Sequence, residues 1–139
     1  MSNRLRALST HPSTEVIVVV GTEHNDNGQF TLRVSGDGSA RVTQQRAGET
    51  REYSQHLDAA ALDAFGKTLA ENEFTRARTS SMPREPGDTP VRLQLTDGGT
   101  SQLEVDIWEA DRYQDKQLAA ILRAAEALIK SMVGDDHYP

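Results

Sequence analysis

The chain has 139 residues, the length of one ordinary domain, and a formal net charge of −6. It contains no cysteine, which excludes disulfide bonds, thiol nucleophiles, thiolate metal sites and iron–sulfur clusters. The acidic balance argues against binding to nucleic acid, because such binding needs many Lys and Arg side chains to displace counterions from phosphates.

No targeting segment is expected. The longest apolar run near the N-terminus, Val16–Val20, has five residues. The core of a signal peptide needs about seven to 15 apolar residues, and a membrane-spanning helix needs about 20. We therefore expect a cytoplasmic protein that carries no export signal and does not bind a membrane.

The first part of the chain divides into an arm and a strand. Residues 1–14 are mostly polar around Leu5 and Leu8, which predicts a flexible N-terminal arm. Val16–Val20 is β-branched throughout and predicts a strand that is central in its sheet and buried on both faces. We expect a single domain over residues 15–133 and a C-terminal tail over 134–139.

Two hairpins are predicted by alternation of apolar and polar residues. Residues 30–34 and 40–42 alternate on either side of a Gly-Asp-Gly-Ser turn, and residues 91–95 and 103–107 do so around Asp-Gly-Gly-Thr. A period of two places one apolar row on a core and one polar row on the opposite face. Residues 51–57 predict a further short strand.

Two helices are predicted by apolar residues at spacings of three and four. Leu62, Phe65 and Leu69 define one face of a helix over about 58–71, with Asp58 as its N-cap. A longer stripe from Leu118 to Met132 defines a second helix over about 114–132. The sequence thus predicts an α+β fold: a mostly antiparallel sheet of about five strands, with both helices packed on one face.

The other face of the sheet is expected to be polar and free to meet a partner. Its predicted members are the polar residues of the alternating strands: Thr31, Arg33, Arg41, Thr43, Arg92, Gln94, Gln102, Glu104 and Asp106.

An acidic segment continues from this face. Residues 97–115 contain six acidic side chains and one arginine, a local balance of −5. A tryptophan among carboxylates on a solvated strand is typical of an interaction anchor. We predict that this segment binds another protein with a basic surface. The predicted partner-binding residues are Glu104, Asp106, Trp108, Glu109 and Asp111. The alternative is that Trp108 caps the core at the strand end while the acids are only solvated.

Histidines and loop carboxylates are the remaining candidates for chemistry. His24 lies beside acids in the loop over residues 22–29, and Asp135, Asp136 and His137 lie in the tail. No motif of a hydrolase, a phosphate-binding loop or a metal site accompanies them, so we expect no catalytic residue, no metal site and no cofactor. The alternative function is a small hydrolase that uses His24, His56 and the loop carboxylates.

One family resemblance covers roughly 100 residues. It begins with Gly-Gln-Phe-Thr-Leu-Arg-Val-Ser-Gly-Asp-Gly-Ser-Ala from Gly28 and continues through Leu62, Phe65, Leu69 and Glu73-Phe74 to Ala77. With the 91–107 hairpin and the closing helix, this pattern resembles the emfourin-like small proteins, which inhibit thermolysin-like zinc proteases. The resemblance implies a non-enzymatic protein-binding domain. It would be an inhibitor of a bacterial protease or, alternatively, an immunity protein that blocks a toxin.

Overall fold

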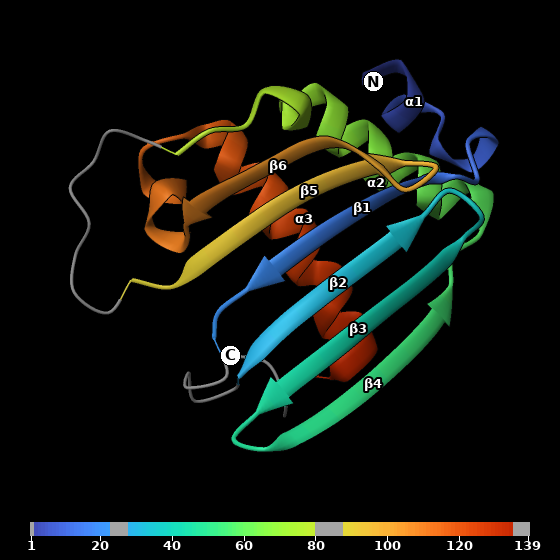
Figure 1. The fold of residues 1–139 in the computed structure, drawn as a ribbon. Coiled ribbons are helices and arrows are strands. Elements are labelled where there is room, and N and C mark those ends of the chain that lie inside the picture. Colours follow the sequence, from blue (N-terminus) through green and yellow to red (C-terminus); the bar gives the residue numbers. More distant parts are fainter. Residues whose placement is uncertain (1, 23–27, 80–87, 135–139) are drawn as a thin grey trace.

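The computed structural model describes residues 2–22, 28–79 and 88–134 (Figure 1). In chain order its elements are α1 (Ser2–Arg6), η1 (Leu8–Thr10), β1 (Thr14–Val20), β2 (Gln29–Ser35), β3 (Ser39–Arg46), β4 (Glu49–His56), α2 (Ala59–Glu71), η2 (Phe74–Arg76), β5 (Pro90–Asp97), β6 (Thr100–Trp108), η3 (Glu109–Tyr113) and α3 (Lys116–Val133).

The described strands form one sheet in the order β4-β3-β2-β1-β5-β6, and all five neighbouring pairs are antiparallel. The predicted α+β class with an antiparallel sheet is confirmed. Within the described residues the sheet has six strands rather than about five, and α1 adds a third α-helix to the two predicted. The short strand predicted over residues 51–57 is β4, whose eight residues are polar apart from Tyr53 and lack the apolar alternation that marks the strands of the two predicted hairpins.

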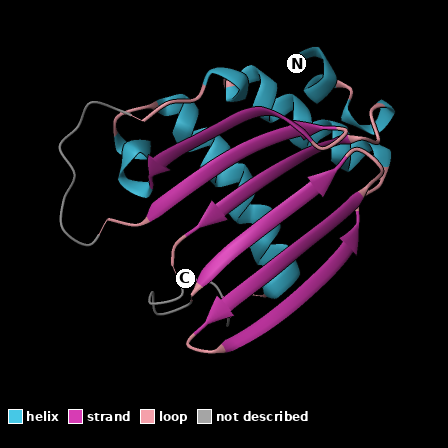
Figure 2. Ribbon diagram, viewed as in Figure 1, coloured by secondary structure: helices cyan, strands magenta, loops and turns pink. Residues whose placement is uncertain are grey.

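The helices all lie on one face of the sheet, behind it in the view of Figure 1 (Figures 1 and 2). The core fills the space between these two layers, because alternate strand residues point toward the helices. In β1, Val16 and Val18 are fully buried on this side. β1 lies between β2 and β5, which confirms its predicted central place.

Side-chain caps fix where the two long helices begin. The Asp58 carboxylate accepts a hydrogen bond of 2.8 Å from the Ala61 amide, as predicted. The Asp115 carboxylate accepts from the amides of Gln117 and Leu118, and so α3 begins at Lys116, slightly later than the sequence predicts. The short η3 helix ends at Tyr113, two residues before the Asp115 cap.

The N-terminal segment is ordered in its described part, whereas the sequence predicts a flexible arm over residues 1–14. Leu5 and Leu8 are completely buried in the core. The Asp63 carboxylate accepts hydrogen bonds from the Ser9 amide and hydroxyl, each 2.8 Å long. The N-terminal segment passes closest to α2 at Gly66. A Cβ at this position would lie 1.9 Å from the Leu5 carbonyl oxygen, so only glycine leaves room for the contact. Local polarity concealed this docking, which depends on contacts with a distant helix.

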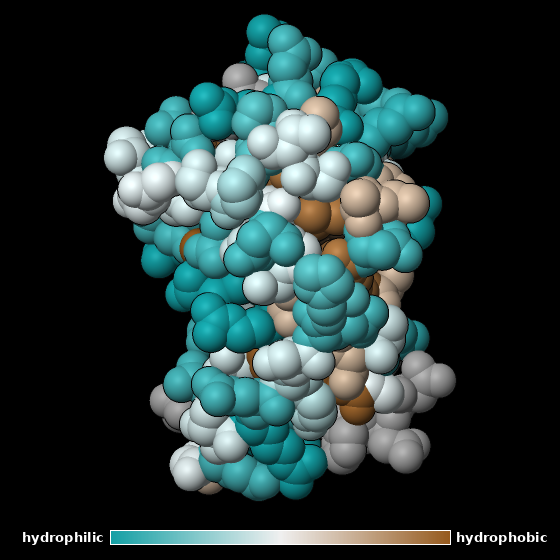
Figure 3. Space-filling model, turned by 90° about the vertical axis from the view of Figure 1, so that its right-hand side faces the viewer, coloured by the Kyte–Doolittle hydropathy of each residue, from teal (hydrophilic) through white to brown (hydrophobic). Residues whose placement is uncertain are grey.

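Few apolar side chains are exposed on the side of the molecule shown in Figure 3. Teal and white residues cover most of this view, and the brown apolar atoms form a thin strip among them. Tyr113 is the exposed large hydrophobic residue of the described chain, at 76%. On this side, polar side chains therefore cover most of the core.

Substitution of Leu122 tests which face of α3 packs against the core. Leu122 is 1% exposed, whereas Arg123 beside it is exposed. We expect Leu122→Ala to lower the free energy of unfolding by about 2–5 kcal/mol, because it leaves a cavity. Arg123→Ala should change it by less than about 0.5 kcal/mol. Urea denaturation followed by circular dichroism measures both, and equal effects would contradict the assigned helix face.

Gly66→Ala tests the docking of the N-terminal segment. In a free helix this substitution is stabilising by up to about 1 kcal/mol. Here the added methyl group collides with the Leu5 carbonyl, so we expect a net loss of about 1–3 kcal/mol. Lys67→Ala, at an exposed neighbouring position, serves as the control and should be nearly neutral. A rise in melting temperature for Gly66→Ala would show that α1 does not pack against this site.

Candidate functional site

We call the face of the sheet that lies opposite the helices the open face. Register determines its members, because residues directly opposite on antiparallel strands point to the same side. Ile17 pairs with Arg33 and Gln94, and Val19 pairs with Thr31 and Arg92. The same pairing continues to both edges of the sheet. The open face therefore includes Glu15, Ile17, Val19, Thr31, Arg33, Arg41, Thr43, Glu52, Ser54, Arg92, Gln94, Glu104, Asp106 and Trp108.

Most of the polar residues predicted for this face lie on it. Gln102 is the exception, because the register shifts between Leu95 and Thr96 and leaves Gln102 without a ladder partner. The strand predicted to be buried on both faces gives this side an apolar centre, in which Ile17 is buried and Val19 is only half-buried. A run of β-branched residues shows no alternation, so it does not reveal which members point away from the helices. The sequence feature that indicates apolar residues on the open face is the predicted central position of this strand. Successive residues of a strand point to opposite faces, so an all-apolar strand places apolar side chains on both.

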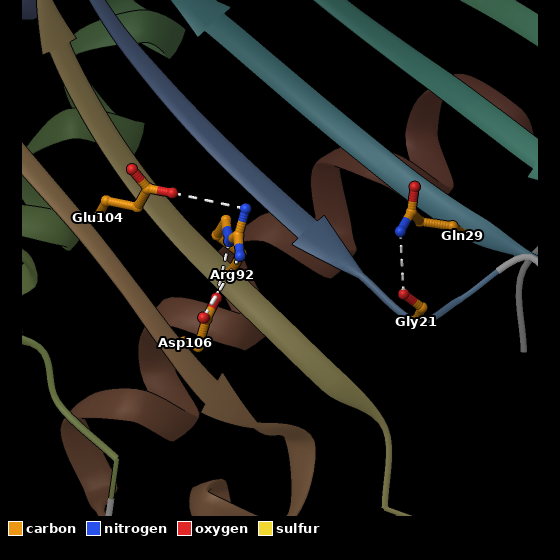
Figure 4. A network of polar contacts seen from close by, with 5 residues as sticks. All are labelled: Gly21, Gln29, Arg92, Glu104 and Asp106. Carbon is orange, nitrogen blue, oxygen red and sulfur yellow. Dashed lines mark hydrogen bonds and ion pairs between the residues drawn. The ribbon is translucent and has the colours of Figure 1, made fainter. Parts of the chain in front are cut away.

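The centre of the open face is a shallow hollow of about 550 Å³. Ile17 and Val19 line it, together with Arg92, Asp106 and Trp108. Ile17 is only 6% exposed although no described helix covers this face, whereas Val19 and Trp108 are half-buried. At the end of β1, the Gln29 side-chain amide donates to the Gly21 carbonyl over 3.3 Å (Figure 4). The hollow thus combines an apolar floor with a polar border.

Arg92 neutralises much of the predicted acidic patch. Its guanidinium donates to the Asp106 carboxylate at 2.7 Å and lies 3.5 Å from a Glu104 oxygen (Figure 4). The hydrogen bonds from Arg92 hold the pKa of Asp106 below its ordinary value, and those to Asp106 raise the pKa of Arg92. The −5 balance of the acidic segment therefore overstates the charge at this surface, because its compensating arginine lies on another strand.

Glu109 and Asp111 lie outside the open face, and their contacts are internal. Asp111 is 2% exposed, and its carboxylate accepts from the Trp108 amide at 3.0 Å and the Thr79 hydroxyl at 2.8 Å. Glu109 lies 3.2 Å from Arg112. The structure thus brings only Glu104, Asp106 and Trp108 together among the five predicted partner-binding residues.

A half-buried ion pair holds the segment of Glu109 and Asp111 against the last helix. Arg112 forms two hydrogen bonds to Glu126 of α3, of 2.6 and 3.0 Å. These bonds, more than the contact with Glu109, raise the pKa of Arg112 above its ordinary value. η3 is therefore fixed to α3, and through Asp111 it fixes the end of β6 that carries Trp108.

The residues of the alternative hydrolase are not assembled in the described part of the chain. His24 and its neighbouring acids, like Asp135, Asp136 and His137, lie outside the described residues. His56 lines a second hollow of about 530 Å³ with Asp37, Ser39 and Ser54. The Ser39 amide donates to Asp37 at 2.8 Å, which is the main reason that the pKa of Asp37 is lowered.

No described hydrogen bond joins His56 to a hydroxyl group, as a serine nucleophile and its base require. Across residues 2–22, 28–79 and 88–134, no group of three or more His, Asp or Glu side chains could hold a metal ion. His56 is on β4 and Trp108 on β6, at opposite edges of the sheet.

No family model matches the chain, and no curated protein matches it. None of the described helices is long and apolar enough to cross a membrane. The fold and the site define a two-layer α+β domain in which one face of the sheet is left open.

The contact between Arg92 and Asp106 predicts an acid titration. We expect Asp106 to titrate below the ordinary range of aspartate, and Arg92→Gln to raise its pKa. Because the folded pKa is depressed, this contact stabilises the fold above the unfolded pKa, and the effect is lost as pH falls through the folded value. Carbon-detected NMR of the carboxyl groups measures the shift. Arg76→Gln, whose partner is Glu73, is the control, and an unchanged Asp106 titration in Arg92→Gln would contradict the contact.

Proposed function

We propose that the chain is a protein-binding domain that acts without catalysis, and that the open face is the surface that meets its target. The observation that supports this proposal is the hollow between β1 and the end of β6, where Ile17 and Val19 form the floor and Trp108 stands at the border. Interfaces concentrate their binding energy in such places, where an aromatic side chain and apolar neighbours lose water together.

Trp108 is well placed to act as the anchor of this surface. Asp111 holds its backbone amide, and the ion pair of Arg112 with Glu126 holds η3 beyond it. A contact residue held by its surroundings loses little conformational entropy on binding. The arginine and carboxylate groups around the hollow then supply a polar rim, which contributes orientation and specificity more than affinity.

Two biological roles agree with such a domain. The emfourin-like pattern favours an inhibitor of a bacterial protease, and an immunity protein that blocks a toxin is the second role. In both, a small domain acts by occupying a surface of its target. Assay of the target's activity with and without the chain distinguishes them: loss of proteolysis indicates the inhibitor, and relief of toxicity indicates the immunity protein.

Capture of the target from the source cells, followed by binding measurements with the purified target, tests the proposal. We expect Trp108→Ala and Val19→Glu each to weaken binding by about 2 kcal/mol or more, close to 30-fold in Kd, because both change the hollow. Isothermal titration calorimetry gives the affinities, and circular dichroism verifies that the variants fold.

Arg123→Glu on the exposed side of α3 is the matched control, because it alters charge on the opposite side of the molecule. It should leave the affinity unchanged. A target that binds both hollow variants as tightly as the unaltered chain, but fails to bind Arg123→Glu, would place the interface on the helices and refute the proposal.

A further inference from the structure

The open face carries opposite charges on its two sides. On one side of β1, the open-face residues of β2 and β3 include Arg33 and Arg41 and no acidic residue, although Glu15 of β1 lies 3.2 Å from Arg33 and the edge strand β4 adds Glu52. Those of β5 and β6 include Glu104 and Asp106 against Arg92 alone. The apolar pair Ile17 and Val19 lies between the two sides. The face therefore has the cationic Arg41 on one side of an apolar centre and, on the other side, two carboxylates that share Arg92.

Register aligns these features along a single row. From β3 to β6 the row is Arg41, Arg33, Ile17, Gln94 and Glu104, each opposite the next. Arg41 and Glu104 thus stand two strands from Ile17, one on each side. Both side chains are exposed, and Arg41 forms no ion pair with a described residue.

A surface of this kind is complementary to itself. Consider a two-fold axis that runs parallel to β1 and lies above the open face. Rotation about it keeps each residue at the same position along the strand direction but reverses the order of the strands across the sheet. It places β6 of one copy over β3 of the other, and β5 over β2. We propose that two copies of the chain pack open face against open face about this axis, so that Arg41 meets Glu104 of the second copy twice, and that Ile17 and Val19 of both copies meet at the centre.

The size of the face agrees with a weak dimer. Five overlapping strands spaced by about 4.8 Å, each about 23 Å long, cover roughly 500 Å² on each copy. The total of about 1,000 Å² is at the lower limit of specific interfaces, so we expect a Kd in roughly the micromolar range. The dimer covers the hollow near Trp108. Self-association and target binding therefore compete for one surface.

Analytical ultracentrifugation of the unaltered chain and of charge-exchange variants tests the dimer without any target. We expect Arg41→Glu and Glu104→Arg each to weaken association by about tenfold or more, because each brings like charges together across the axis. The double variant Arg41→Glu, Glu104→Arg should recover most of the association, since both pairs are restored with their charges exchanged. If the single variants associated weakly only because each substitution damaged the fold, combining the two substitutions would not restore association.

Arg123→Glu on α3 is the control and should dimerise as the unaltered chain does. A chain that is monomeric up to about 1 mM overturns the dimer, and so does a double variant as weak as the two single ones. Either result leaves the proposed function standing, because binding of the target to the hollow is measured separately. Conversely, a dimer with the expected recovery stands even if the target binds elsewhere.

Discussion

The pleat of the strands is the constraint on which the rest of the structure depends. Successive side chains point to opposite faces, so a row of valines and leucines that meets the helices must alternate with a row that does not. With all described helices on one side, the second row has no covering layer. The open face follows directly from this arrangement, and β1 brings apolar groups onto it because Ile17 and Val19 alternate with the buried Val16 and Val18.

Much of the fold could be predicted because its signals are local. Alternation defined the two hairpins, and the stripe of α3 defined its buried face, where Ile121, Leu122 and Ala125 lie almost free of solvent contact. β4, predicted only as a short strand over residues 51–57, and the N-terminal segment, predicted as a flexible arm, were predicted less well for a common reason. Their sequences are mostly polar, and their order comes from neighbours far along the chain: β3 pairs with the whole length of β4, and α2 receives Leu5 at Gly66.

In the candidate site too, the features that depend on local sequence pattern could be predicted, and those that depend on contacts between distant residues could not. Side-chain parity placed Glu104, Asp106 and Trp108 on one face, and that required only the strand pattern. Charge, by contrast, depends on which groups meet in space. Arg92, 14 residues before Asp106, compensates the acids, and Asp111 turns inward to hold backbone and hydroxyl groups. Counting charges along a segment could not separate a solvated carboxylate from one that stabilises the fold.

β4 has a consequence for how the sheet ends. Nearly every residue of this edge strand is exposed, and Glu49, Arg51 and Glu52 carry charge along it. An unpaired edge is a template on which other chains can extend a sheet, and charged side chains oppose such growth because each added strand would have to desolvate them. At the β4 edge, the charged side chains therefore oppose the addition of a strand from another chain, while the broad face of the sheet stays accessible.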